Sequence, residues 1–180
     1  MGEDVVTVAQ PWTVVVMGVS GSGKSAVGVP TAQRSGAVFL EADDFHPRAN
    51  VDKMSAGIAL TDQDRWPWLD ALVAAIRSEH ERGHSVVLTC SALRRVYRDR
   101  LRAADPHMLF LHLSGDRAVI QQRMELREHF MPPALLESQI ATLESLDDDE
   151  HHAAVNIDQP LASVIDDAIA TMARFGLTGG

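Results

Sequence analysis

The sequence has one cysteine, Cys90, among 180 residues, so no disulfide can form within the chain. Disulfides are typical of oxidising compartments, so we expect a cytoplasmic protein. Apolar runs are short: none could span a bilayer, and the acidic N-terminus has no apolar core of the kind a signal peptide needs. Basic residues are few, 16 against 25 acidic ones, which gives a net charge of −9. We therefore expect no membrane and no nucleic-acid partner.

Short apolar segments alternate with helical patterns along the chain. The segments predicted to be strands are residues 13–19, 37–42, 86–90, 108–113 and 153–157. Between them, apolar residues recur at helical spacing around residues 68–76, 93–101, 135–143 and 161–175. This alternation predicts an α/β fold built from βαβ units, with a parallel sheet covered on both sides. The length favours a single domain, residues 1–180.

One predicted helix contains a conflict. The segment KSAVGVPTAQRSG, residues 24–36, has Gly28 and Pro30 inside a helical pattern. A proline within a helix removes a hydrogen bond and clashes with the carbonyl four residues earlier, which here belongs to Ala26. We expect a kink or a weakened turn near residues 26–30.

The segment GVSGSGKS, residues 18–25, fits the pattern of a P-loop, with a buried strand before it and a helix after it. Glycines let the backbone fold around an anion with its N–H groups pointing inward, and the helix N-terminus adds positive charge. The pattern predicts a nucleoside triphosphate site with Lys24 on the β and γ phosphates and Ser25 on Mg²⁺. A glycine-rich turn that binds nothing is the alternative. The residues predicted to bind the nucleotide are Gly18, Ser20, Gly21, Ser22, Gly23, Lys24, Ser25 and Ala26.

Charged side chains gather where the second and third predicted strands end. The first group is EADDFHPRANVDKM, residues 41–54, and the second is CSALRRVYRD, residues 90–99. Either could be a solvated surface segment. Together, at the edge of a parallel sheet where α/β proteins bind ligands, they favour a hydroxylated substrate with its own negative charge.

A further basic segment follows the fourth strand. In SGDRAVIQQRMELREHFMPP, Arg123 and Arg127 are one helical turn apart, and HFMPP then breaks the helix. This pattern predicts a helical lid, approximately residues 116–135, that brings two arginines over the phosphates. A helical corner with solvated arginines is the alternative.

At this point the chain resembles the gluconate kinases among the P-loop small-molecule kinases. The resemblance rests on MGVSGSGKS, DDFHPRANVDKM, LTDQDRWPWLDAL, TCSALRRVYRDRLR, REHFMPPALLESQIATLE and NIDQPL, and it covers nearly the whole chain. It implies a P-loop NTPase fold with five parallel strands in the order 2-3-1-4-5. The implied activity is ATP-dependent phosphorylation of D-gluconate to 6-phospho-D-gluconate with ATP and Mg²⁺, and the implied assembly is a homodimer.

The resemblance also implies roles for single residues. Asp43 matches the aspartate beside the acceptor hydroxyl and would accept its proton. Arg94 and Arg98 are expected to bind the gluconate carboxylate, since the arginine fork suits a carboxylate. The other residues expected to contact the substrate are His46, Lys53 and His129, with Arg48 also close. Arg123 and Arg127 would cap the transferring phosphoryl group, and Gln159 and Pro160 would pack on adenine.

Two alternatives stay open at this stage. One is a P-loop kinase for another small acceptor, such as shikimate or a nucleoside monophosphate. The other is a nucleotide-binding module without turnover. The charged acceptor segments favour a polyol acid over a nucleobase, and Asp43 with the lid arginines argues against a mere sensor.

Overall fold

Five parallel strands form one sheet in the order β2-β3-β1-β4-β5, as expected. The structure is a computed structural model that describes residues 10–125 and 133–177. The strands are β1 (Thr13–Met17), β2 (Val38–Glu41), β3 (Val86–Thr89), β4 (Leu109–Ser114) and β5 (His152–Asn156). Each lies within a residue or two of its predicted segment, and the α/β class is confirmed.

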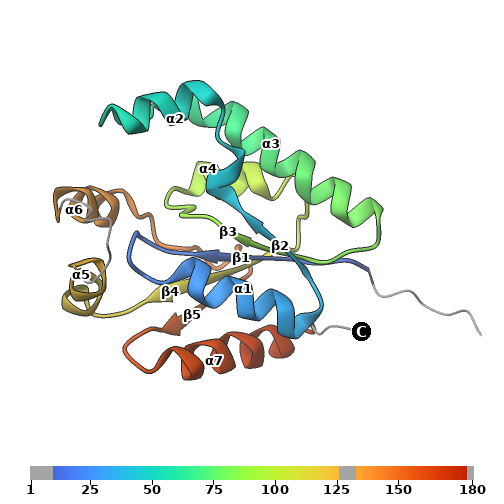
Figure 1. The fold of residues 1–180 in the computed structure, drawn as a ribbon. Coiled ribbons are helices and arrows are strands. Elements are labelled where there is room, and N and C mark those ends of the chain that lie inside the picture. The colour runs from blue at the N-terminus through green and yellow to red at the C-terminus, as the bar shows by residue number, and fades with distance from the viewer. Residues whose placement is uncertain (1–9, 126–132, 178–180) are drawn as a thin grey trace, which may run out of the picture.

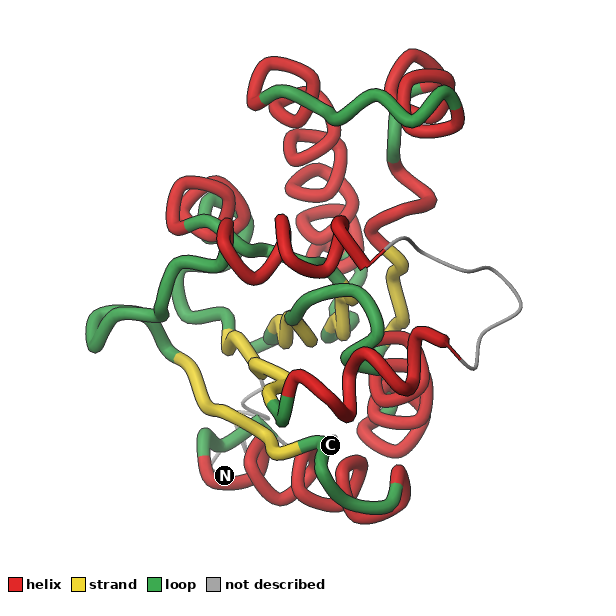
Figure 2. Tube along the Cα trace, turned by 90° about the vertical axis from the view of Figure 1, so that its left-hand side faces the viewer, coloured by secondary structure: helices red, strands yellow, loops and turns green. Residues whose placement is uncertain are grey.

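Helices cover both faces of this sheet (Figure 1). α3 (Asp62–Glu81) and α4 (Arg95–Leu101) lie on one face, and α1 (Lys24–Ser35) and α7 (Leu161–Arg174) lie on the other. Toward the carboxyl edge of the sheet lie α2 (Arg48–Ser55), α5 (Arg117–Glu125), α6 (Pro133–Thr142) and the 3₁₀ turn η1 (Ala42–Phe45). Figure 2 turns this edge toward the viewer and shows the strands between the two helical layers.

The predicted lid is covered only in part. It includes α5 and the beginning of α6, but its central residues, 126–132, lie outside the described residues. In the part of the chain that the structure describes, no helix has the length and apolar character needed to cross a bilayer.

The central strand β1 is buried from both sides. Val14 and Val16 pack into the core formed with α1 and α7, whereas Val15 and Met17 pack into the core formed with α3 and α4. All four side chains have no exposed surface. Burying an apolar side chain of this size stabilises a fold by roughly 1.5–3 kcal/mol. The strand is therefore a fixed support for the loop that follows it.

Two helices bear on the sequence predictions. α1 continues through Pro30 as one helix of 12 residues, and the kink expected near residues 26–30 stays a prediction. Ala26, whose carbonyl loses its partner, is exposed and can be hydrated. α3 begins at Asp62 rather than near Trp68. Thr61 accepts a hydrogen bond from the Asp64 backbone N–H, and Asp64 accepts one from the Thr61 N–H, so the segment TDQD forms a capping box that hydrophobic spacing does not reveal.

The position of Arg98 contradicts the prediction that this residue binds a substrate carboxylate. Its side chain has no exposed surface, and its Nε lies 2.7 Å from Oε1 of Glu150, which is equally buried. The guanidinium also donates to four backbone carbonyls, those of Ala92, Leu93, Glu144 and Ser145. Arg98 therefore joins α4 to the segment after α6, and its donors are already used within the protein.

Glu150 ends the acidic segment DDDE, residues 147–150, yet its side chain has no exposed surface. Burial alone would raise the pKa of Glu150, but hydrogen bonds from Arg98 and from the Asp147 N–H bring the pKa below the ordinary value of 4.5. Because the pKa is lowered by folding, the pair stabilises the protein above pH 4.5. Its contribution is lost as the pH falls further.

We expect Arg98→Ala to lower the free energy of unfolding by about 3 kcal/mol, because it leaves a buried carboxylate without its main partner. Arg100→Ala is the matched control: its partner Asp70 is half exposed, so the loss should stay below about 1 kcal/mol. Urea denaturation at pH 7 measures both. An Arg98→Ala protein of unchanged stability with weakened substrate binding would restore the original prediction.

Candidate active site

The loop after β1 has the backbone that the P-loop pattern predicts. Gly18 and Gly21 have φ angles of 151° and 82°, which residues with side chains rarely adopt. A Cβ at Gly18 would lie 2.9 Å from the carbonyl oxygen of Leu113, and one at Gly21 would collide with Met124. The loop is thus packed tightly from outside, and only glycine allows this path of the backbone.

The inner side of the loop suits an anion. α1 begins at Lys24 after Gly23, and no side chain caps its N-terminus, so its first N–H groups can serve a ligand. Ser22 is fully buried, and within the described structure its hydroxyl has no hydrogen-bond partner. Buried hydroxyls are normally satisfied. These features fit a bound polyphosphate.

Lys24 lies over its own loop. Its Nζ donates to the carbonyl oxygens of Gly18, at 3.1 Å, and Val19, at 3.3 Å. The ammonium therefore stays at the loop that would hold the phosphates. Cys90 follows β3 directly and is buried, and this burial raises the pKa of its thiol to about 12.

Ser25 has a partner that sequence reasoning missed. Its hydroxyl donates to Oε2 of Glu41 at 2.6 Å, and Glu41 is the last residue of β2. A hydroxyl beside a carboxylate is an oxygen pair of the kind that Mg²⁺ prefers. The available signal was the position of Glu41 at the carboxyl end of a strand, two residues before Asp43.

Asp43 and Asp44 lie in the turn η1, because β2 ends at Glu41 and does not continue through them. The Asp43 side chain is 85% exposed and is accessible to an acceptor. The turn itself is anchored: the Trp68 indole N–H donates to the Ala42 carbonyl at 2.7 Å, and Ala42 is buried. α3 thus fixes the backbone that carries Asp43.

His46 lies behind Asp43 and is largely buried. Its ring stacks on Trp68, with centroids 4.3 Å apart, and its Nε2 is 4.0 Å from an Asp43 carboxylate oxygen. Burial lowers the pKa of His46. The negative charge of Asp43 raises the pKa, and the positive charge of Arg65 lowers it further. The Asn50 amide lies 3.3 Å from Nδ1, and when it donates there, the neutral ring carries its proton on Nε2, toward Asp43.

The segment after His46 is tied to the start of α3. Asn50 donates to the Asp64 carbonyl at 2.8 Å, and Lys53 Nζ lies 2.6 Å from Asp64 Oδ1. Hydrogen bonds from Lys53 and then from Thr61 lower the pKa of Asp64 to about 2. α2 is therefore fixed against α3, and Lys53, whose side chain is 40% exposed, has its charge held in one place.

The two predicted basic residues Arg94 and Arg48 differ in setting. Arg94 donates to Asp62 at 2.7 Å and to Glu144 at 3.4 Å, and a third of its side chain is exposed. Tyr97 donates to the same Asp62 at 2.6 Å. Arg94 is therefore positioned yet accessible, whereas the exposed Arg48 pairs only with Asp52 in the described contacts.

Arg123 lies between the P-loop and the end of β5. Its Nη2 donates to the Ile157 carbonyl at 2.6 Å, and a Cβ at Gly23 would lie 4.0 Å from its Nη1. The neighbouring Gln159 donates to the Asn156 carbonyl and to Asp167, and Pro160 precedes α7. Arg123 thus lies beside the P-loop, and its predicted role in capping the transferring phosphoryl group stays a prediction. Arg127 and His129 lie outside the described residues.

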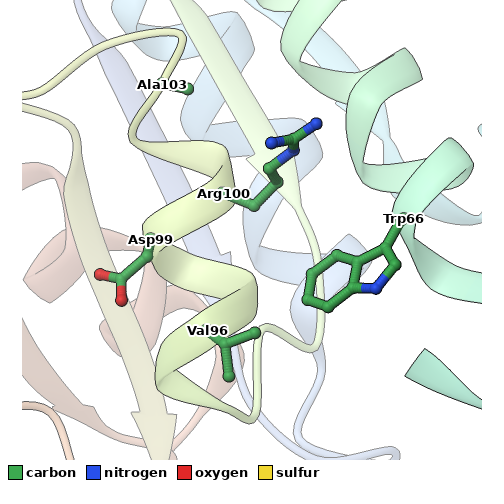
Figure 3. Close-up of a pocket in the computed structure, with 5 residues that line it drawn as sticks. All are labelled: Trp66, Val96, Asp99, Arg100 and Ala103. Carbon is green, nitrogen blue, oxygen red and sulfur yellow. The ribbon is translucent and has the colours of Figure 1, made fainter. Parts of the chain in front are cut away.

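A separate groove of about 650 Å³ lies between α3 and α4 (Figure 3). Its lining residues include none of the predicted site residues; they are Trp66, Val96, Asp99, Arg100 and Ala103. The described residues also hold no cluster of three or more potential metal ligands of the His, Cys, Asp or Glu type.

Comparisons with known proteins identify the family of this chain. A family described as AAA domain matches residues 14–146. A gluconokinase from Gluconobacter oxydans is 49% identical over 142 residues, covering 78% of this chain and 80% of that protein. The chain belongs to the gluconokinase family. A solved gluconokinase from Sinorhizobium meliloti is 46% identical with a TM-score of 0.83, over 92% of this chain and 94% of that chain. An unliganded sugar kinase from Janibacter sp. is 47% identical with a TM-score of 0.84, over 91% and 95%.

The segment HPRANVDKM, which carried much of the gluconokinase resemblance, forms one connected unit. His46 contacts Asn50, Asn50 contacts the Asp64 backbone, and Lys53 contacts the Asp64 side chain. The pattern therefore specifies how α2 is attached to α3 beside Asp43. The predicted contacts of His46 and Lys53 with the substrate stay predictions.

We expect Lys24→Ala to lower ATP turnover by about 10²–10³-fold, because it removes a fixed positive charge from the phosphate loop. The fold should survive, since Lys24 is not a core residue. Arg34→Ala, which removes an exposed charge at the other end of α1, should leave turnover unchanged. Steady-state kinetics with a thermal melt of each protein tests this. Near-normal turnover of Lys24→Ala would contradict it.

Proposed function

We propose that this chain transfers the γ phosphoryl group of ATP to D-gluconate, which yields 6-phospho-D-gluconate and ADP. Membership of the gluconokinase family supports the reaction. The structural observation that carries the proposal is the 2.6 Å hydrogen bond between Ser25 and Glu41. It attaches the end of β2 to the P-loop, and Asp43 follows two residues later, so nucleotide and acceptor groups meet at one edge.

The P-loop residues would hold the triphosphate. Inward N–H groups and the N-terminus of α1 bind the phosphates, and Lys24 moves from its loop carbonyls to phosphate oxygens. Ser25 and Glu41 are the residues that would hold Mg²⁺, which supplies charge neutralisation between phosphate groups when it is bound. Gln159 and Pro160 would border the adenine.

Asp43 would orient the acceptor hydroxyl and take its proton. Its exposure leaves it accessible, and η1 holds its backbone. The buried His46 stays neutral near Asp43, so it can direct an N–H toward the carboxylate without adding a charge. Asp43, carried on the anchored turn, would then act as the general base.

Arg94 would bind the carboxylate of gluconate, with Lys53 and His129 as further contacts. Asp62 and Glu144 hold Arg94 in place while part of its side chain stays open. Arg98 is no longer part of this proposal, because it is buried against Glu150. Arg123 and Arg127 would stabilise the transferring phosphoryl group.

The family resemblance also supports a homodimer in the cytoplasm as the working form. The mass of the protein in solution, measured by light scattering, tests the dimer independently of the reaction.

We expect ADP release to be slow with ATP alone and to rise at least tenfold when D-gluconate is added, because phosphoryl transfer requires a positioned acceptor. A coupled assay with D-gluconate, other sugar acids, shikimate and nucleoside monophosphates measures this. The proposal fails if another acceptor is preferred, or if gluconate leaves the rate unchanged.

Asp43→Asn should lower kcat by about 10²–10⁴-fold, because the amide keeps the shape but cannot take the proton. KM for gluconate should change little. Asp44→Asn is the matched control on the same turn and should be much milder. If Asp44→Asn is the inactive variant, Asp44 is the base; if both stay active, neither is.

A further inference from the structure

Gln139 on α6 contacts Ser20 of the P-loop, although the two residues are 119 positions apart in the sequence. The Ser20 backbone N–H donates to Oε1 of Gln139 at 2.6 Å, and Nε2 of Gln139 donates to the Ser20 hydroxyl at 3.1 Å. Hydrophobic spacing marks the neighbouring residues of α6 as a packing face, and nothing in that pattern assigns a role to Gln139.

The chemistry of the partners fixes how the amide is turned. A backbone N–H can only donate, so the Gln139 atom facing Ser20 N must be the carbonyl oxygen. Nε2 must then face the Ser20 hydroxyl, which accepts. Both ends of the side-chain amide are used. A leucine at this position could reproduce neither hydrogen bond, and a glutamate would keep an acceptor for the Ser20 N–H but could not donate to the Ser20 hydroxyl.

The hydrogen bond controls one peptide group of the loop. The Ser20 N–H belongs to the same planar peptide as the Val19 carbonyl. That carbonyl accepts from the Ser22 N–H at 3.2 Å and from Lys24 Nζ at 3.3 Å. The peptide is therefore held from both sides: its carbonyl points to Lys24, and its N–H points to Gln139.

Gly21, which follows Ser20, explains why a hydrogen bond from outside the loop is useful. Gly21 has φ 82° and lacks a Cβ, so the loop backbone here has more freedom than elsewhere. Packing limits it on one side, where Met124 and Ile120 of α5 lie against Gly21. Gln139 limits it on the side of α6.

We propose that Gln139 is a positioning residue of the nucleotide site, which fixes the Val19–Ser20 peptide and so presets the loop and Lys24 for a triphosphate. This inference rests on nucleotide binding in the proposed function and not on gluconate as the acceptor. It extends the nucleotide site to a side chain of α6 that touches the loop and need not touch the ligand.

The test measures ATP binding by calorimetry without any acceptor. We expect Gln139→Leu to raise the Kd for ATP by roughly fivefold to thirtyfold, since about two hydrogen bonds of ordinary strength are lost. Gln139→Glu should weaken ATP at least as much, because it keeps an acceptor for Ser20 N–H but adds negative charge beside the phosphates. The effect of Gln139→Glu should also depend more on salt.

The controls separate positioning from general damage. Gln33→Leu and Gln33→Glu make the same changes at an exposed glutamine near the far end of α1 and should leave Kd unchanged. With Ser20→Ala, a double-mutant cycle against Gln139→Leu should be non-additive. If a gluconate assay is available, KM for gluconate at saturating ATP should stay within about twofold.

Unchanged ATP affinity in folded Gln139→Leu overturns the proposal, as does an additive cycle with Ser20→Ala. If Gln139→Leu does not fold, Gln139→Glu decides alone: wild-type affinity at low salt contradicts the proposal. Failure of gluconate as an acceptor would instead change only the proposed reaction, because ATP binding is measured separately.

Discussion

The site depends on one constraint: backbone N–H groups of a single loop must face an anion, at the end of a strand that cannot move. The burial of β1 on both faces supplies the fixed strand. Left-handed glycines supply the path, and the side chains of α5 fill the space that the missing Cβ atoms leave. Each feature requires the others, because a mobile strand or a bulkier loop residue would turn N–H groups away from the phosphates.

The protein has a net charge of −9, which repels the anions ATP and sugar acid. Binding them therefore requires positively charged groups placed at the site itself. Glu41 and Asp43 bring negative charge to the loop, and Lys24, the N-terminus of α1 and Arg123 oppose it. At the acceptor side Arg94 and Lys53 are each held by carboxylates that leave them partly exposed. Such pairs fix where a charge lies without neutralising the region, which suits recognition more than stability.

Local patterns in the sequence predict the strands, the parallel α/β class and the P-loop, because burial periodicity and loop chemistry are properties of short segments. The sheet order and the gluconokinase membership were predicted from the family resemblance. They do not predict partners distant in sequence. Arg94, Arg95 and Arg98 look alike in RRVYR, yet their partners differ. Arg98 pairs with Glu150 in the interior, Arg95 pairs with Asp147 and Asp149, and Arg94 pairs with Asp62 and Glu144. Glu41 was missed for the same reason, since its meaning comes from Ser25 across the fold. The roles of Asp43 and His46 remain predictions.

The start of α3 fixes the turn that carries Asp43, the predicted general base. Its capping box fixes Thr61 and Asp64, Asp64 holds Lys53, and Trp68 holds both the Ala42 carbonyl and the His46 ring. Asp43 is exposed, so nothing in its own side-chain contacts restrains it strongly; its position comes from the backbone turn behind it.

A general base on a free loop would lose much of its advantage to misalignment, since displacement by about 1 Å can cost roughly a hundredfold in rate. Anchoring the turn through a buried indole and a neutral imidazole gives the carboxylate a fixed place while leaving its oxygens open to the acceptor. A charged partner in direct contact would fix it as well, but it would also lower its basicity.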